Sequence, residues 1–234
     1  MMTESYNELI AATLFFVGGH FLLCSRALRQ GLSGRFGPQA ARAITALALF
    51  ASFVWMILAY GRAPAWPLWS PPPVFAFVPL LTMPFASILL VAAFTTPSPT
   101  GPAGAALVKD APRLTIGGIL TVTRHPFLWA TALWAFSHLF VAGQLATVIV
   151  CVGILLLSFV GMWHIDLRRE AELGSAWGPV KLTSSVVPFR AIAAGRCRFD
   201  WRGIGWARLL GGLALTVALL FLHGRFTGHP LLPL

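Results

Sequence analysis

The sequence is dominated by six apolar stretches of near membrane-spanning length, joined by short connections. A transmembrane helix needs about 20 mostly apolar residues to cross the hydrocarbon core. Only 10% of the 234 residues are charged and 57% are hydrophobic, whereas about a quarter of the residues in soluble domains are charged. We therefore predict an all-α, polytopic integral membrane protein with six transmembrane helices. The predicted spans are Leu9–Ser25, Ala40–Tyr60, Val74–Thr95, Phe127–Ala142, Leu145–His164 and Gly205–His223.

Only Gly143 and Gln144 separate the fourth and fifth predicted spans. Glycine commonly ends a helix because it adopts the left-handed backbone conformation without steric cost. We expect a tight hairpin here, with no room for an extramembrane domain between the two spans. We also find no internal repeat, so residues 1–234 are predicted to form a single transmembrane domain.

The basic residues indicate how the chain is oriented in the membrane. The connections 26–42, 96–126 and 165–206, with the first residues of the sixth span, contain 15 of the 17 lysines and arginines. The positive-inside rule places these connections in the cytoplasm and both termini outside. The start of the chain lacks the basic region and cleavage site of a signal peptide, so we expect the first span to be retained.

Two other protein classes are disfavoured by the same composition. The basic residues lie between apolar runs and form no continuous stripe, so they are better explained as topology determinants than as a nucleic-acid surface. The three cysteines Cys24, Cys151 and Cys197 are widely spaced and have no C-x-x-C pattern. We therefore expect neither a disulfide framework nor a zinc site.

Two histidines, His20 and His138, fall inside predicted spans. Ionisable groups are costly in hydrocarbon, so they are candidates for function. A neutral imidazole is a good axial ligand for haem iron, and two of them would hold a b-type haem. Trp134 shares a helix face with His138 and could line the porphyrin together with Phe15, Phe16 and Phe136. A propionate could pair with Arg26, Arg124 or Arg169. The simpler interpretation is that each histidine is hydrogen-bonded to a neighbouring helix.

The tripeptide Arg124-His125-Pro126 begins the fourth predicted span. Proline is favoured at the first turn of a helix. The free amides of a helix start, together with Arg124, would favour an anion at the cytoplasmic face. The alternative is a helix start with an interfacial arginine that binds no ligand.

Four sequence blocks resemble the NnrU proteins of denitrifying bacteria. They are GGHFLLCSRALR at 18–29, VTRHPFLWATALWAFSHLFVAGQLA at 122–146, IDLRRE at 165–170 and TSSVVPFRAIAAGR at 183–196. The chain is similar, more distantly, to the 15-cis-ζ-carotene isomerases of plants and cyanobacteria. NnrU proteins are linked to nitrite and nitric oxide metabolism. The resemblance thus implies a bacterial inner membrane protein, with a nitric oxide or nitrite reductase as a possible partner and a hydrophobic small molecule as a possible substrate.

The resemblance to the isomerases implies a haem b cofactor bound by histidines. The two ligand positions of that family match His20 and His138. In the isomerases a cysteine three residues before the second histidine is implicated in a ligand switch on reduction. Ala135 occupies that position here. The departure puts the redox-switched isomerase chemistry in doubt and leaves ligation by two histidines open.

A remoter resemblance is to the isoprenylcysteine-type membrane methyltransferases, which also have an R-H-P motif before a helical hairpin. It implies an S-adenosylmethionine site around Arg124 and His125, with Arg169, Glu170 and Pro188 as further equivalents. The aromatic residue usual two positions after the proline is replaced by Leu128, which departs from that pattern.

The haem hypothesis depends on whether the two histidines lie at the same depth in the membrane. If Arg26 and Arg124 mark one interface, His20 lies about 9 Å deep and His138 about 21 Å deep. The difference narrows if the first span continues to Arg29, and His125 is a spare ligand candidate. We place a haem protein with a redox, sensing or isomerase-like role first, a non-enzymatic assembly partner of a reductase second, and a methyltransferase third. The sequence does not establish whether the protein is an enzyme.

Overall fold

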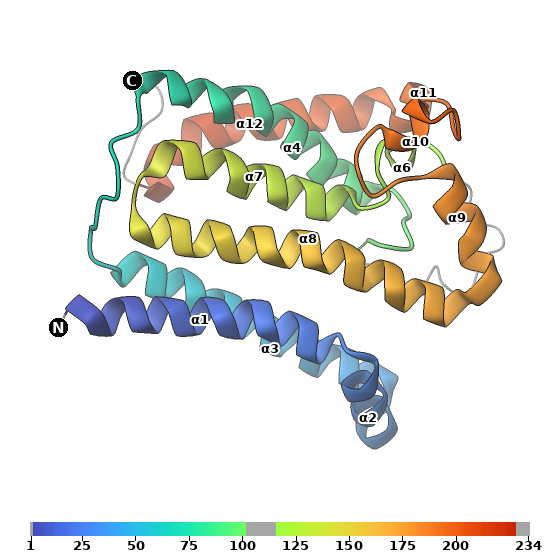
Figure 1. The fold of residues 1–234 in the computed structure, drawn as a ribbon, viewed down its shortest axis with the longest axis horizontal. Helices are drawn as coiled ribbons and strands as arrows, with labels where there is room; N and C mark the ends of the chain where they lie inside the picture. The colour runs from blue at the N-terminus through green and yellow to red at the C-terminus, as the bar shows by residue number, and fades with distance from the viewer. Residues whose placement is uncertain (1, 102–115, 228–234) are drawn as a thin grey trace. The chain divides into compact units, whose positions relative to one another are not determined.

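A computed structural model of the protein describes residues 2–101 and 116–227, with side chains from Tyr6 to Arg225. Within these residues every regular element is a helix (Figure 1), which confirms the all-α class. Residues 102–115 of the predicted basic connection 96–126 lie outside the described residues. The long helices are α1 (Met2–Leu23), α2 (Arg26–Phe36), α3 (Pro38–Arg62), α4 (Phe77–Thr95), α7 (Pro126–Ala142), α8 (Leu145–Leu173) and α12 (Trp206–Thr227). The short ones are η1 (Pro73–Ala76), α6 (Ile119–Val122), η3 (Gly174–Trp177), α9 (Gly178–Thr183), α10 (Arg190–Ala193) and α11 (Trp201–Ile204).

Five of the described helical stretches are long and apolar enough to cross a membrane. They are Tyr6–Leu23, Pro38–Arg62, Pro73–Thr95, Leu145–Thr183 and Trp206–Arg225. The remaining predicted span corresponds to α7, a shorter apolar helix of 17 residues. Many large apolar side chains on these helices, such as Leu47, Leu81 and Phe85, are about two-thirds exposed, as expected for residues that face lipid rather than water. The protein is therefore a multi-pass membrane protein.

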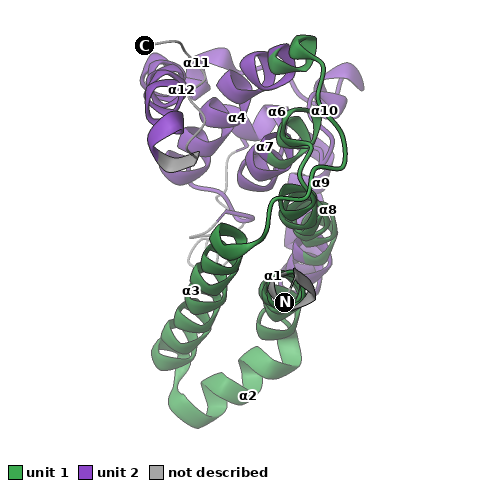
Figure 2. Ribbon diagram, turned by 90° about the vertical axis from the view of Figure 1, so that its left-hand side faces the viewer, with its two compact units in different colours: residues 1–76, 135–164 green, residues 77–134, 165–234 purple. Residues whose placement is uncertain are grey.

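The chain divides into two compact units (Figure 2). Unit 1 comprises residues 1–76 and 135–164, and unit 2 comprises residues 77–134 and 165–234. The division passes through α7 and α8, each of which contributes residues to both units. The single domain predicted from the sequence is not tested by this division.

In unit 1, α1 and α3 pack against each other as an antiparallel pair. The Tyr6 hydroxyl donates to the Pro64 carbonyl at 2.6 Å near one end of the pair, and Gly19 lies against Leu49 toward the other. The helices α1 and α8 are parallel. Thr13 and Val17 lie against Gly153, and farther along both helices the Phe21 ring meets the His164 ring 6.0 Å away. The shared core contains Leu9, Ala12, Phe16, Met56, Ala59, Ala146 and Val150.

The α7–α8 junction is fixed to the segment that follows α3. Gly143 has a φ of 58°, and its carbonyl oxygen accepts the Leu68 amide at 2.7 Å. The Leu145 amide donates to the Trp66 carbonyl at 3.0 Å. A Cβ atom on residue 143 would overlap the carbonyl oxygen of Trp69. The glycine predicted to end the helix is therefore required for both its conformation and its size.

In unit 2, α4 packs against α12 at glycine. A Cβ on Gly212 would come within 2.5 Å of the Ile88 Cα atom, so the helices approach more closely there than any larger residue allows. Arg208 of α12 binds the end of α4, donating from Nη2 to the Thr95 carbonyl at 2.8 Å and from Nε to the Thr95 hydroxyl at 2.9 Å. The core of the unit contains Leu89, Ala92, Ile119, Leu120, Val122, Ala130 and Ile204.

We predict that Gly143→Ala destabilises the protein. The left-handed conformation costs a non-glycine residue about 1–2 kcal/mol, before any displacement of Trp69 is counted. In mild detergent, thermal unfolding followed by circular dichroism should show a midpoint lowered by roughly 2–8 °C.

The matched control is Gly61→Ala, because Gly61 is helical and a Cβ atom added there would meet no neighbouring side chain or segment within 4 Å in the described chain. Alanine should there leave the midpoint unchanged or raise it slightly, since it favours the helix. Equal midpoints for the two variants would contradict the junction described above.

Candidate functional site

The residues from Thr123 to His125 form a short non-helical link between α6 and α7. Thr123 is extended, with φ −152° and ψ 145°, and it ends α6. The residue before a proline is pushed away from helical conformation, so His125 stays outside α7 while Pro126 begins it. The Trp129 amide donates to the His125 carbonyl at 3.0 Å as the first helical hydrogen bond. The helix start predicted at Pro126 is confirmed.

Two neighbouring segments of unit 2 hold this link in place. The Arg124 amide donates to the Ser185 carbonyl at 3.0 Å, and the Thr123 hydroxyl donates to the Val186 carbonyl at 2.8 Å. From the other side, the Thr100 hydroxyl donates to the Arg124 carbonyl. The link thus has protein partners along both edges, which accounts for its nearly complete burial.

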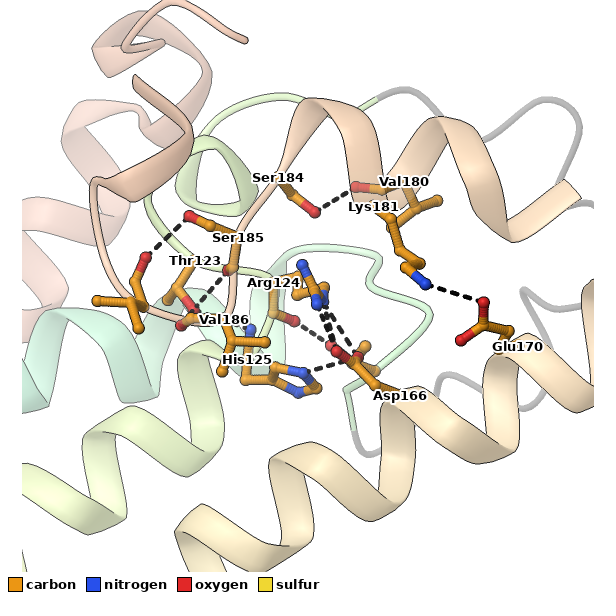
Figure 3. Close-up of polar contacts among 12 residues, drawn as sticks. Thr123, Arg124, His125, Asp166, Glu170, Val180, Lys181, Ser184, Ser185 and Val186 are labelled. Atoms are coloured by element: carbon orange, nitrogen blue, oxygen red, sulfur yellow. Dashed lines mark hydrogen bonds and ion pairs between the residues drawn. The ribbon is translucent and has the colours of Figure 1, made fainter. Parts of the chain in front are cut away.

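Asp166 of α8 binds both Arg124 and His125 (Figure 3). Arg124 Nε lies 3.0 Å from each carboxylate oxygen, and Nη2 pairs with Oδ2. His125 Nε2 lies 3.0 Å from Oδ1. The side chains of Arg124 and Asp166 are only 10% and 16% exposed. This is a forked guanidinium–carboxylate contact, which is among the strongest polar contacts in proteins.

The His125 imidazole is fully buried and is best described as neutral. Its contact with the carboxylate places a hydrogen on Nε2. Its other nitrogen, Nδ1, is buried and has no hydrogen-bond partner in the described part of the chain. Burial lowers the pKa of His125 below its ordinary value of 6.5, although Asp166 acts in the opposite direction. A second proton on Nδ1 would be a buried donor without an acceptor, which is costly.

Arg169 extends the same polar network along α8. It lies one turn after Asp166 and is 3% exposed. Its Nε donates to the Pro99 carbonyl at 2.7 Å, and its Nη1 contacts Glu172 Oε2 at 2.5 Å. Three of the four blocks that carry the family resemblance, at 122–146, 165–170 and 183–196, therefore contribute residues to one polar cluster in unit 2.

The arginines of this cluster are paired with acids of the protein. Asp166 pairs with Arg124, and Glu172 pairs with Arg169 and, at 3.9 Å, with Arg168, while His125 contributes no charge when neutral. Arg124 is therefore already bound to a carboxylate, whereas the predicted anion site requires a guanidinium that can face a ligand. The S-adenosylmethionine site stays a prediction. What the described contacts explain is how the start of α7 is fixed.

His20 is placed in unit 1, toward the end of α1, and its ring is held by the helix itself. Its Nδ1 lies 2.7 Å from the Phe16 carbonyl oxygen, and its ring meets the Phe16 ring edge to face at 4.5 Å. When Nδ1 donates to a carbonyl, the lone pair lies on Nε2, which is the arrangement of a metal-bound histidine. The Nε2 atom of His20 would therefore be able to bind the iron of a haem.

The structure does not bring His138 to the same depth as His20. His20 lies between the α1 residues that contact Gly153 and His164, so it is at the level of about residue 160 of α8. That level is roughly 22 Å from the start of α8 at 1.5 Å per residue. His138 is four residues from the end of α7, next to that start, and thus about 16 Å from His20 along the axis. Ligation of one iron by both histidines stays a prediction that this arrangement does not explain.

The structure shows where Trp134 and His138 lie but does not test whether either contacts a ligand. Trp134 lies one turn before His138 on α7 and is 36% exposed. The Ser137 hydroxyl lies 3.4 Å from His138 Nδ1. Among the described residues, no group of three or more His, Cys, Asp or Glu side chains could hold a metal ion.

Asp166 is the residue that the sequence analysis missed. It lies more than 40 residues from its two partners, so no local pattern connects them. One signal was available: the chain has only seven acidic residues, and Asp166 directly follows an apolar span. A carboxylate at that position is expected to pair with a basic side chain that the protein buries.

We predict that Asp166→Asn strongly destabilises the protein. The substitution leaves the Arg124 guanidinium buried without its counter-charge, which typically costs about 3–5 kcal/mol. Glu170→Gln is the matched control, because Glu170 pairs with Lys181 at an exposed position and such pairs contribute about 0–1 kcal/mol. Thermal unfolding in detergent measures both, and equal midpoints would contradict the buried pair.

We also predict that stability falls as the pH is lowered through the range below 6.5. The pKa of folded His125 is depressed, so the unfolded chain takes up the proton first and gains stability relative to the fold. His125→Gln keeps a donor for Asp166 but cannot titrate. Unfolding midpoints compared at about pH 7.5 and about pH 5.5 should show a smaller decrease in this variant. An unchanged decrease would assign the pH dependence to other groups.

Comparisons with known proteins identify the family. The NnrU protein family model matches residues 8–231. The chain is 30% identical over 115 residues to the chloroplastic 15-cis-zeta-carotene isomerase of Zea mays, covering 49% of this chain and 31% of that protein. It is 30% identical over 92 residues to the isomerase of Arabidopsis thaliana, covering 39% of this chain and 25% of that protein. The matches thus span less than a third of these relatives, and no solved structure matches the chain. Because the family model covers nearly its whole length, the chain belongs to the NnrU family.

Proposed function

We propose that the protein is a haem-b-binding membrane protein with an isomerase-like role toward a hydrophobic small molecule. Membership of the NnrU family and similarity to proteins named 15-cis-zeta-carotene isomerase support the isomerase-like role. The observation that carries the cofactor assignment is the environment of His20. Its Nδ1 is bonded to the Phe16 carbonyl, so its Nε2 can bind iron.

The chain's own residues would orient this ligand before any cofactor binds. The hydrogen bond from Nδ1 fixes the tautomer and the direction of the ring, and Phe16 packs against one side of it. His20 also continues the inward-facing stripe of α1 that includes Thr13 and Phe16. A bound haem would supply an iron that changes oxidation state beside a conjugated substrate. Such substrates dissolve in the bilayer, so a membrane-embedded protein can take them up without a soluble carrier.

We propose six membrane spans, with α7 as the sixth and a tight α7–α8 hairpin. A helix of 17 residues is about 26 Å long, slightly short of a hydrocarbon core of about 30 Å. The non-helical link that precedes Pro126 makes up part of this difference. The distribution of lysine and arginine supports an inner-membrane topology with both termini outside the cytoplasm.

The link to nitrite and nitric oxide metabolism comes from the sequence resemblance. Partnership with a nitric oxide or nitrite reductase, as an assembly protein without activity of its own, stays a prediction. No contact in the described residues favours it over the cofactor-binding role.

A difference spectrum of the purified protein tests the proposal. Protein expressed with ample haem precursor and purified in mild detergent should show a reduced-minus-oxidised spectrum of a b-type haem. His20→Ala should remove the haem signal while circular dichroism and elution volume stay as in the wild type. A wild-type protein without a Soret band would overturn the proposal.

The matched variant is His138→Ala, which distinguishes one protein ligand from two. Because His138 lies about 16 Å from His20 along the helices, this variant should retain haem. If it loses haem as completely as His20→Ala does, the helices must rearrange so that both histidines bind one iron, as the sequence resemblance implies.

A further inference from the structure

Helix α2 is a separate, well-bounded helix between two candidate spans. The Ser25 hydroxyl caps its start by accepting the Leu28 amide at 3.4 Å. Gly37, with a φ of 80°, ends it, and Pro38 begins α3 directly afterwards. None of its residues is buried within unit 1. The helix is thus held at both ends while much of its surface has no protein partner in the described chain.

The side chains of α2 are arranged as in helices that lie on a membrane surface. Leu28, Leu32 and Phe36 recur every four residues and form one apolar stripe. At 100° per residue, Arg29 and Arg35 lie about 60° to either side of the centre of that stripe. Long basic side chains in this position can extend their charges toward headgroups while their stems cover apolar surface. The pattern is that of an interfacial amphipathic helix.

The charges on this helix have no counter-charge in the described part of the protein. Arg26, Arg29, Arg35 and the nearby Arg42 of α3 form no ion pair with the described acids. The described acid of unit 1, Glu8, is bound to Arg62 at 3.2 Å. Glu8 is 18 residues from Arg26 along α1, about 27 Å away. The four arginines are therefore available to a negatively charged partner outside the protein.

The lengths of α1 and α3 place α2 at a membrane surface. From Arg42 to Arg62 α3 rises about 30 Å, which equals the thickness of a hydrocarbon core. The Glu8–Arg62 pair is at one end of the antiparallel α1–α3 pair, and α2 connects the helices at the other. The arginines of α2 are thus positioned at the level of lipid headgroups.

We propose that α2 binds the phosphate groups of anionic phospholipids at the bilayer surface. Arginine suits this role because its planar guanidinium can donate two parallel hydrogen bonds to one phosphate. Phe36, which is 52% exposed, would lie among the upper acyl chains, whereas Leu28 and Leu32 are partly covered by the protein. The site would be selective for anionic over zwitterionic lipids, because only the former add net negative charge to the surface.

Lipid binding by the full-length protein in a neutral detergent tests this proposal. The probes are fluorescent short-chain phosphatidylglycerol and phosphatidylcholine, and the readout is the ratio of their dissociation constants. Each basic residue near an anionic surface contributes about fivefold in affinity, so R26Q/R29Q/R35Q should weaken phosphatidylglycerol binding on the order of a hundredfold. Binding of phosphatidylcholine should change little. In the wild type, added salt should weaken binding of the anionic lipid only.

Two control variants make the result decisive. R26K/R29K/R35K keeps the charges and should retain most of the preference for phosphatidylglycerol. R190Q/R198Q/R202Q removes three exposed arginines elsewhere in the chain and should also retain it. The proposal is overturned if the wild-type protein has no preference, or if R26Q/R29Q/R35Q keeps it. It is equally overturned if the lysine variant loses as much as the glutamine variant, because the loss would then not depend on charge.

Discussion

The ion pair between Arg124 and Asp166 is the interaction on which the polar part of unit 2 depends. A chain with few charged residues and long apolar helices has to pair the charges that it buries, because neither lipid nor protein interior solvates them. Asp166 pairs with Arg124 and also accepts a hydrogen bond from the His125 ring. Arg124 lies in the link between α6 and α7, and its backbone is bonded to Thr100 and Ser185. The ion pair therefore connects α8 to the segments around these two residues. The start of α7 is fixed as a consequence.

The structure gives His125 and His20 different environments, although both were candidate ligands from the sequence. His125 belongs to a cluster of ion pairs in which its Nε2 already binds Asp166. His20 lies in the other unit, where its Nδ1 is bonded to its own helix and its Nε2 points to no partner that the described contacts include. A buried, internally paired histidine fixes structure, whereas an imidazole held by one nitrogen can offer the other to a cofactor. His125 therefore belongs to the framework, whereas His20 is the residue that we propose as a cofactor ligand.

The sequence predicted the features that local chemistry determines. Apolar runs predicted the helical class and five of the candidate spans, Pro126 predicted the start of α7, and Gly143 predicted its end. It did not reveal α2, because 11 residues with three arginines look like a connection unless their helical spacing is examined. It also did not pair Arg124 with Asp166, since that contact depends on how α8 packs. The depth of His20 relative to His138 likewise depends on the register between α1 and α8, which no local pattern encodes.

A double-mutant cycle on Arg124 and Asp166 tests whether this ion pair holds the start of α7 in place. Unfolding free energies of the wild type, Arg124→Gln, Asp166→Asn and the double variant would be measured in one detergent system. If the pair holds the framework together, the double variant should be no worse than either single one, so the coupling energy should be at least as large as the larger single loss, about 3–5 kcal/mol. Additive losses, with a coupling energy near zero, would contradict the account, because the two side chains would then not depend on one another.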